Sequence, residues 1–208
     1  MKRYRITLLV VCLVLLFLGY TDLNLLFRNP KPMPVQIAEL EQGEPQQEWL
    51  TIKGGHQNLL EAISTSGSVE VNAFLVPLKT APEAEDYRVL VETRNPQIVE
   101  TLKTYYFKLE SDRERQEFLE KNRQFFFGSR EVTGMVMSGL IGKNNRNRLA
   151  KLSRDYGIDV PENVLLFTEG KTPAKLRGFF FVGIGLLGLG KLALNWRKKS
   201  GGGLKPLP

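Results

Sequence analysis

Histidine and cysteine, two side chains common in catalytic and metal sites, occur once each in this chain. His56 is its only histidine, and histidine is the side chain best suited to exchange protons near neutral pH. No Gly-x-Ser-x-Gly nucleophile elbow occurs in the sequence, and a lone histidine without nearby cysteines is unlike a zinc site. We therefore predict no catalytic residue, no metal and no cofactor, and we interpret His56, beside Gly54 and Gly55, as a surface residue.

Carboxylates are the other groups that could carry acid–base chemistry, because two of them held close together titrate at different pH values. Two short segments hold several acids, namely Glu83, Glu85 and Asp86, and Asp155, Asp159 and Glu162. Their spacing does not fit a calcium-binding loop. Acidic loops are usually solvated, so an enzyme that uses His56 or a carboxylate pair is kept only as an alternative.

A short glycine-containing segment invites comparison with a phosphate loop. Residues 139–144 read Gly-Leu-Ile-Gly-Lys-Asn. A Walker loop needs a glycine five residues before Gly142 and a serine or threonine after Lys143, but those positions hold Met137 and Asn144. The segment is therefore interpreted as a turn that leads into a helix.

The following segment, 146–156, is predicted to be a basic amphipathic helix that ends at Gly157. Its positive side chains, with the lysine just before them, form the candidate site for an anion or a lipid headgroup: Lys143, Arg146, Arg148, Lys151 and Arg154. Free N–H groups at a helix start favour anions, and each basic residue near an anionic membrane contributes about 1 kcal/mol. A solvated helix face is the simpler interpretation, because Leu149 and Leu152 already account for the helix.

Two apolar runs bracket the chain. The second, residues 178–196, covers about 28 Å as a helix, close to the roughly 30 Å of a bilayer core. It ends at Trp196, a residue type favoured at the membrane interface, and Lys191 lies near enough to that end for its ammonium to reach the headgroups. This run is predicted to span a membrane.

The first run, residues 6–20, follows the basic residues Lys2, Arg3 and Arg5, as in a secretory signal peptide. A cleavage site needs small residues after the run, but only Gly19 is small there and the chain soon turns apolar again. We therefore predict an uncleaved signal anchor. The expected segments are a cytoplasmic tail (1–5), the anchor (6–27), an extracytoplasmic domain (28–175), a second transmembrane helix (176–196) and a flexible cytoplasmic tail (197–208).

The charge distribution decides the expected orientation and partners. The net charge of +7 suggests nucleic-acid binding, yet residues 29–175 carry 19 Lys and Arg against 21 Asp and Glu, a net of −2. The excess lies at the chain ends, and basic flanks mark the cytoplasmic side of a span. We predict both termini in the cytoplasm of a bacterium, the domain in the periplasm, membrane lipids and a membrane protein as partners, and no nucleic acid.

Glycines in the second run suggest a helix-packing face. Gly178, Gly185 and Gly188 fall on roughly one side of a helix, and Gly183 and Gly190 on another. Small residues let membrane helices approach closely. We predict that the first three glycines pack against the first span or against a partner's helix. Their spacing is not Gly-x-x-x-Gly, so it implies no homodimer motif.

The segment between the runs is predicted to be an α+β domain with a mixed or antiparallel sheet, one option being an OB-like barrel. Strands are expected at 35–40, 49–53, 69–76, 87–93, 132–137 and 164–167, and helices at 59–63, 96–105, 111–125 and 146–156. Pro96 suits the first position of a helix. Ser111 and Glu114 have the spacing of a capping box.

Three function classes follow from these features. A non-enzymatic interaction or assembly factor of the cell envelope is preferred, because the chain is anchored twice and few of its residues suit catalysis. A membrane-tethered enzyme and a binder of a small ligand or lipid headgroup are the alternatives. The layout of one domain between two spans is similar to that of Surfeit-type oxidase assembly factors and of membrane-anchored ubiquitin ligases, whose zinc-binding cysteines this domain does not have. The similarity is one of topology and implies no particular activity.

Overall fold

The computed structural model describes residues 2–64, 72–137, 161 and 163–200. The chain divides into two compact units. One comprises Met1–Pro30 together with Pro173–Pro208, and the other is the central segment Lys31–Thr172.

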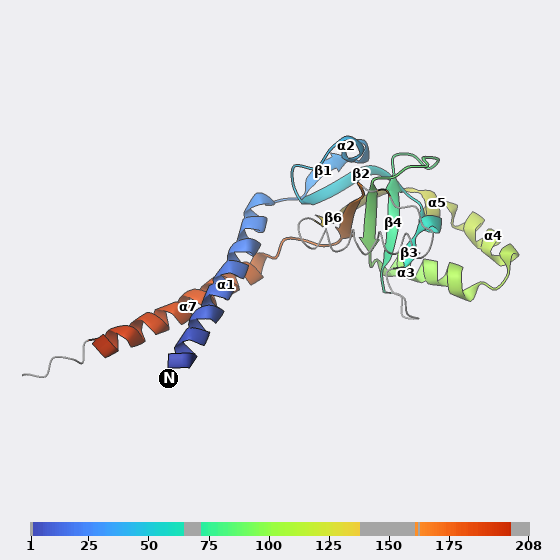
Figure 1. The fold of residues 1–208 in the computed structure, drawn as a ribbon. Helices are drawn as coiled ribbons and strands as arrows, with labels where there is room; N and C mark the ends of the chain where they lie inside the picture. The colour runs from blue at the N-terminus through green and yellow to red at the C-terminus, as the bar shows by residue number, and fades with distance from the viewer. Residues whose placement is uncertain (1, 65–71, 138–160, 162, 201–208) are drawn as a thin grey trace, which may run out of the picture. The chain divides into compact units, whose positions relative to one another are not determined.

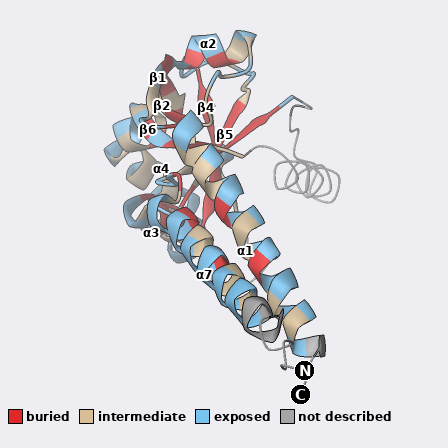
Figure 2. Ribbon diagram, turned by 90° about the vertical axis from the view of Figure 1, so that its left-hand side faces the viewer, coloured by how far each residue is buried: buried red, intermediate tan, exposed pale blue. Residues whose placement is uncertain are grey.

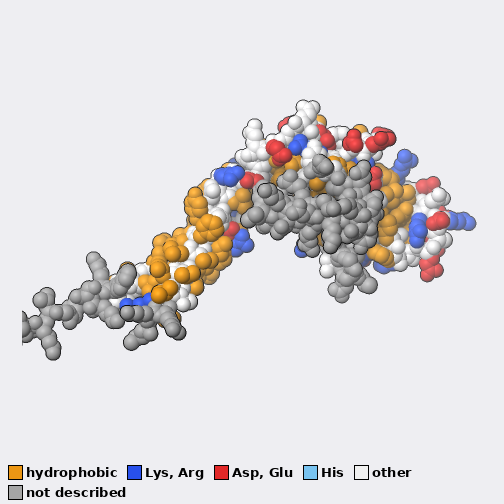
Figure 3. All heavy atoms as spheres, in the orientation of Figure 1, with side chains coloured by type: hydrophobic (Ala, Val, Ile, Leu, Met, Phe, Trp, Pro, Cys, Tyr) orange, Lys and Arg blue, Asp and Glu red, His pale blue; other side chains and the backbone are white. Residues whose placement is uncertain are grey.

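The first unit is a pair of long helices, α1 (Lys2–Arg28) and α7 (Lys175–Ser200). They lie side by side in both ribbon views (Figure 1, Figure 2). Both are long and apolar enough to span a membrane, and only 11% of the most apolar part of each is buried within the chain. A core helix of a soluble protein would be mostly buried, whereas hydrophobic side chains cover the outside of this pair (Figure 3).

The central unit mixes strands and helices. Its strands are β1 (Met33–Gln36), β2 (Trp49–Gln57), β3 (Ile63–Ser64), β4 (Phe74–Lys79), β5 (Val89–Thr93), β6 (Ser129–Val136) and β7 (Leu165–Glu169). Its helices are α2 (Ile37–Gln42), the 3₁₀ turn η1 (Leu59–Glu61), α3 (Pro96–Lys103), the π-helical turn η2 (Thr104–Lys108), α4 (Asp112–Lys121) and α5 (Arg123–Phe127).

The strands form one mixed sheet that closes on itself. Their order is β1-β2-β6-β7-β5-β4-β3, and an additional β2–β4 pairing joins β2, β6, β7, β5 and β4 into a ring. The β5–β7 and β1–β2 pairs are parallel, and the remaining pairs are antiparallel. The central unit is therefore a five-stranded barrel, with β1 and β3 added to it.

A bulge in β2 accounts for the closure. The β2–β6 register shifts between Ile52 and Gly55, and Gly54 has φ +70°, a conformation that glycine adopts without steric cost. Bulges bend and twist a strand. Strand β2 pairs with β6 on both sides of the bulge, up to His56. Its other edge pairs with β1 before the bulge and with β4 after it, at His56 and Gln57.

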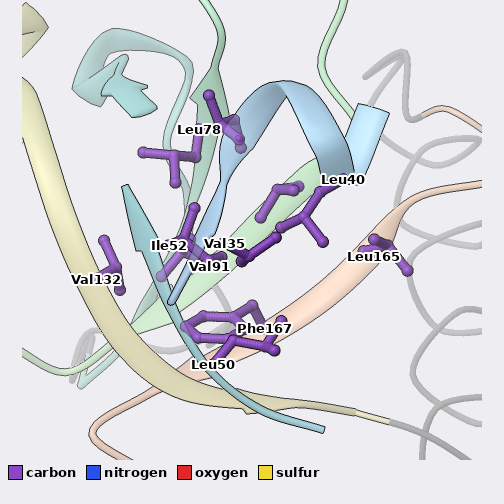
Figure 4. Packing of buried hydrophobic residues seen from close by; sticks show 11 residues of the cluster. Val35, Leu40, Leu50, Ile52, Leu78, Val91, Val132, Leu165 and Phe167 are labelled. Carbon is purple, nitrogen blue, oxygen red and sulfur yellow. The ribbon is translucent and has the colours of Figure 1, made fainter. Parts of the chain in front are cut away.

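Alternating side chains fill the barrel interior. The inner cluster contains residues from every strand of the ring, among them Leu50, Val132, Phe167, Val91 and Leu78 (Figure 4). Buried residues of the short helix α2, Ile37 and Leu40, belong to the same cluster. Burial of a leucine or valine side chain contributes about 1.5–3 kcal/mol, so this filled interior is a main source of the domain's stability.

A second cluster continues the interior beneath the helices. Phe74 and Val76 of β4 pack with Leu102 of α3 and Phe126 of α5. Buried residues on the opposite faces of β4, β5 and β7, such as Leu75, Leu90 and Leu166, form a separate third cluster. Side chains from α2, α3 and α5 therefore extend the packed core beyond the strands.

Several local predictions are confirmed. Pro96 opens α3, where the Asn95 side chain accepts a hydrogen bond from the Gln97 N–H. Ser111 and Glu114 form a reciprocal capping box at the start of α4. The expected mixture of helices and sheet is present, although the described residues form a sheet of seven strands where six strands were expected.

One expected strand, residues 35–40, is largely wrong. The strand β1 ends at Gln36, and the chain then turns into α2. Ile37 and Leu40 are three residues apart and both buried, as expected for neighbours on one helix face. In so short a segment, the spacing of the apolar residues does not distinguish a strand from a single helical turn.

Candidate functional site

The barrel strands carry a polar end cluster, composed of Gln57, Arg130 and Glu169. Arg130 lies two residues before the buried Val132 on β6, and Glu169 lies two residues after the buried Phe167 on β7. Side chains two residues apart share a face of a strand. Arg130 and Glu169 therefore point towards the interior, and their side chains are only 16% and 20% exposed.

The charges of this polar end cluster are paired with each other. Arg130 forms an ion pair with Glu169 and also donates a hydrogen bond to the Gln57 side chain, with N and O 3.5 Å apart. The Gln57 amide donates to the carbonyl of Phe125 in α5. Removing one partner of a buried ion pair leaves an uncompensated charge, so we assign the cluster a structural role in joining β2, β6, β7 and α5.

His56, interpreted from the sequence as a surface residue, is in fact partly buried in strand β2. It lies on β2 opposite Lys79 of β4 and Ser129 of β6. Its Nδ1 atom is buried and has no hydrogen-bond partner among the described residues, whereas a catalytic triad needs an acid that orients the imidazole through this atom. The neighbouring Lys79 ammonium is bound by Glu61 at 2.7 Å. Within the described ranges, no three His, Cys, Asp or Glu residues are grouped to hold a metal ion.

The other candidate groups are placed only in part. Glu83, Glu85 and Asp86 are exposed in the connection between β4 and β5. The remaining acids, Asp155, Asp159 and Glu162, lie outside the described residues. The anion-site residues Lys143, Arg146, Arg148, Lys151 and Arg154 also lie outside them. The proposed anion site therefore stays a prediction.

Arg88 is a central residue that sequence reasoning missed. Its guanidinium donates hydrogen bonds to the carbonyls of Leu40 at 2.8 Å and Gly43 at 3.0 Å, at the end of α2. It also forms an ion pair with Glu44 at 3.0 Å, and its own side chain is 12% exposed. A cation at a helix C-terminus binds carbonyls that lack partners within the helix. Arg88 thus fastens α2, and with it Ile37 and Leu40, to the barrel.

The three glycines singled out in the second apolar run face α1. A Cβ atom on Gly178 would meet the Leu23 side chain at 3.0 Å, and one on Gly185 would meet Leu16 at 2.8 Å. A Cβ atom on Gly188 would collide with the sulfur of Cys12. These contacts belong to the first unit alone.

The other two glycines of that helix face open space. A Cβ atom on Gly183 or Gly190 would meet no described atom within 4 Å. The two glycine faces of α7 therefore differ in their surroundings.

An ion pair joins the same two helices. Arg177 of α7 donates two hydrogen bonds to the carboxylate of Asp22 in α1, at 2.7 and 2.8 Å. Asp22 is 13% exposed and Arg177 is 62% exposed. The pair was not predicted, although one acid near the end of the first apolar run and one arginine at the start of the second were visible in the sequence.

Comparison with known proteins adds no assignment to these sites. No family model, no curated protein and no solved structure matches the chain. The geometry of its own residues is therefore the basis for any function.

Proposed function

We propose that the protein is an integral membrane protein that spans the bilayer twice and displays its barrel as a non-enzymatic interaction or assembly module of the cell envelope. The observation that carries the proposal is the pair α1 and α7, two long apolar helices that are mostly exposed. Apolar side chains left exposed over such a length are stable in lipid rather than in water.

The barrel supports an interaction role by its architecture. Numbered in chain order, the ring strands β2, β4, β5, β6 and β7 are arranged first-second-third-fifth-fourth, with the third and fifth parallel. We infer an OB-like barrel from this order. Such barrels bind through an outer face and loops, and here the interior is packed with side chains.

The charge pattern supports a bacterial inner-membrane location with both termini in the cytoplasm. The short ends hold clustered lysines and arginines without acids, whereas residues 29–175 carry a net charge of −2. Basic flanks are retained in the cytoplasm, and long domains cross the membrane largely regardless of their charge.

Copurification tests the interaction role. The full chain, extracted in mild detergent, is compared with Gly134→Val, because a Cβ atom at Gly134 would collide with the carbonyl of Thr168 and meet the Phe167 ring at 2.9 Å. We expect a partner protein to be retained by the native chain and lost with Gly134→Val, although α1 and α7 still insert. The matched control is Gly43→Ala in the same unit, where a Cβ atom meets nothing within 4 Å.

Two results would contradict the proposal. One is a partner that binds Gly134→Val as strongly as the native chain, because the barrel would then not be the interaction module. The other is an enzymatic activity that is abolished by His56→Ala, which would favour the enzyme alternative.

A further inference from the structure

The contact between α1 and α7 runs along most of their length. The residues of α1 that meet the glycine face are Cys12, Leu16, Gly19 and Leu23, spaced alternately four and three residues apart. This is the spacing of a continuous helix-packing seam. Residues early in α1 contact residues late in α7, as Cys12 contacts Gly188 and Leu23 contacts Gly178. The two helices are therefore antiparallel.

At Gly19 the two backbones themselves are close. A Cβ atom there would meet the carbonyl oxygen of Gly178 and the amide nitrogen of Val182, each at 2.9 Å. Backbone atoms cannot move aside as a side chain can, so only glycine fits this position. Close backbone approach at small residues is how helices pack in a bilayer, where lipid tails are as apolar as leucine.

One charged contact fixes the axial register of the two helices. The Asp22 carboxylate binds the Arg177 guanidinium through two hydrogen bonds. A two-point bond between planar groups is geometrically specific. Shifting one helix by a turn, about 5.4 Å, would break it and would leave an acid beside the apolar run.

We infer that α1 and α7 bind each other within one chain as a locked antiparallel hairpin, with Asp22–Arg177 as the lock. The face of Gly178, Gly185 and Gly188 is then occupied by the chain's own first helix, not by a partner's helix. The inference rests on the proposed membrane location but not on the role of the barrel. Gly183 and Gly190 lie outside this contact, because a Cβ atom on either meets nothing within 4 Å.

Cys12, the only cysteine of the chain, provides a direct test. A Cβ atom at position 188 would lie 3.9 Å from the Cβ of Cys12, inside the roughly 3.5–4.5 Å range of disulfides. In isolated membranes treated with a mild oxidant, Gly188→Cys should form an intramolecular disulfide. The product migrates as a monomer. After denaturation in SDS, which exposes the buried Cys12, neither thiol reacts with maleimide until a reductant is added.

Gly190→Cys is the matched control, because a Cβ atom there meets nothing within 4 Å. After the same oxidation and denaturation in SDS, both of its thiols should react with maleimide. Overturning results are a disulfide-linked dimer of Gly188→Cys, which would place the glycine face against another chain, or equal reaction of the two variants.

The lock is tested by charge variants in the Gly188→Cys background. Asp22→Asn and Arg177→Gln should each slow disulfide formation roughly two- to fivefold, in line with a partly exposed ion pair. Exchange of the charges, Asp22→Arg with Arg177→Asp, should restore the rate. An exchanged variant as slow as the single variants would show that the pair does not hold the helices in register.

Extraction separates this inference from the proposed membrane location. A chain released from membranes by alkaline carbonate would contradict the membrane location whatever the disulfide result. A chain retained in the membrane that shows no disulfide in Gly188→Cys would overturn the hairpin alone.

Discussion

At the scale of single residues, the side chain of Arg88 joins several separate segments of the central unit. It binds the end of α2, the Glu44 side chain and the carbonyl of Asn163, while its own carbonyl accepts the N–H of Leu165 in β7. A planar guanidinium can satisfy several carbonyls at once, whereas a lysine ammonium cannot match that geometry. The residue therefore holds α2 over the barrel through bonds that only arginine can make together.

Replacing Arg88 tests this role. Arg88→Ala should lower the free energy of unfolding by about 2–4 kcal/mol, because it leaves buried carbonyls without partners, and Arg88→Lys should lower it by less. The measurement is urea unfolding in detergent in a Trp196→Phe background, because the chain has two tryptophans. The signal is then the fluorescence of Trp49, which is 9% exposed.

Arg94→Ala is the control for that experiment. Arg94 also pairs with an acid, Glu92, but its side chain is 73% exposed, and exposed pairs contribute about 0–1 kcal/mol. Equal losses for Arg88→Ala and Arg94→Ala would show that the bonds to α2 do not matter.

Tyr106 shows how a residue on an irregular turn is held. Its hydroxyl donates a hydrogen bond to the carbonyl of Leu60 at 2.9 Å. Burial and, to a smaller extent, the neighbouring Tyr105 raise the pKa of Tyr106 above its ordinary value. The neutral phenol is thus the form that the π-helical turn η2 accommodates.

At the scale of elements, the start of α4 is a pH-sensitive cap. Glu114 accepts hydrogen bonds from the backbone N–H groups of Ser111 at 3.3 Å and Glu110 at 3.1 Å. These bonds, led by the one from Ser111, lower the pKa of Glu114 below its ordinary value of 4.5. A carboxyl whose pKa is lower in the folded state contributes stability above its unfolded pKa and loses it as pH falls through the folded pKa.

Hydrogen exchange of the first turn of α4 measures this effect. After correction for intrinsic rates, protection of the Ser111, Glu114 and Arg115 amides, which are hydrogen-bonded in the cap, should fall as pH drops below 4.5, the ordinary pKa of Glu114. Glu114→Gln should abolish that dependence. Ser111→Ala, which removes the other half of the cap, should lower helix stability by about 1 kcal/mol at neutral pH.

Glu117→Gln is the control on the same helix. Glu117 pairs with Arg113 through exposed side chains and is not part of the cap. The cap explanation fails if Glu117→Gln removes the acid sensitivity while Glu114→Gln keeps it.

The elements that sequence reasoning predicted well are those decided by near neighbours. The Asn95–Pro96 start of α3 and the Ser111–Glu114 cap each depend on residues within three positions of each other. Closure of the barrel depends instead on the bulge after Ile52 and on pairing between distant strands. Pairing between distant strands leaves no local pattern in the sequence. A closed barrel could therefore be predicted only as one option for the mixed sheet.

The candidate sites show the same limit. Arg130 and Glu169 are 39 residues apart in sequence, and Asp22 and Arg177 are 155 apart. No periodicity links such residues, and each alone resembles an ordinary surface charge. His56 could be singled out because it is the only histidine of the sequence. Its place between Lys79 and Ser129 on the neighbouring strands could be known only from the fold.

At the scale of the whole molecule, the proposed topology can be tested with two reporters. A reporter that works only in the cytoplasm should be active when fused after Pro208, and one that works only outside should be active when inserted near Pro82, in the exposed β4–β5 connection. The reason is the concentration of lysine and arginine at the two short ends. Activity of the opposite reporter at both positions would show that the orientation is reversed.

A matched variant tests the physical cause of that orientation. Replacing Lys2, Arg3 and Arg5 together with Gln removes the basic residues of the first end and should produce a mixed population, with part of the chains inverted. An unchanged orientation would show that the second span and the basic residues after it determine the orientation.

The ring order of the strands has a consequence for the timing of synthesis. β7 lies between β6 and β5 in the ring, yet it is the last strand to be made, and it ends at Glu169, shortly before α7 begins at Lys175. Until β7 emerges, β5 and β6 each have an unpaired edge, and such edges promote aggregation. Folding of the nascent domain therefore finishes only as the second long helix is being synthesised, and chains cut short before Leu165 should be substrates for proteases and chaperones.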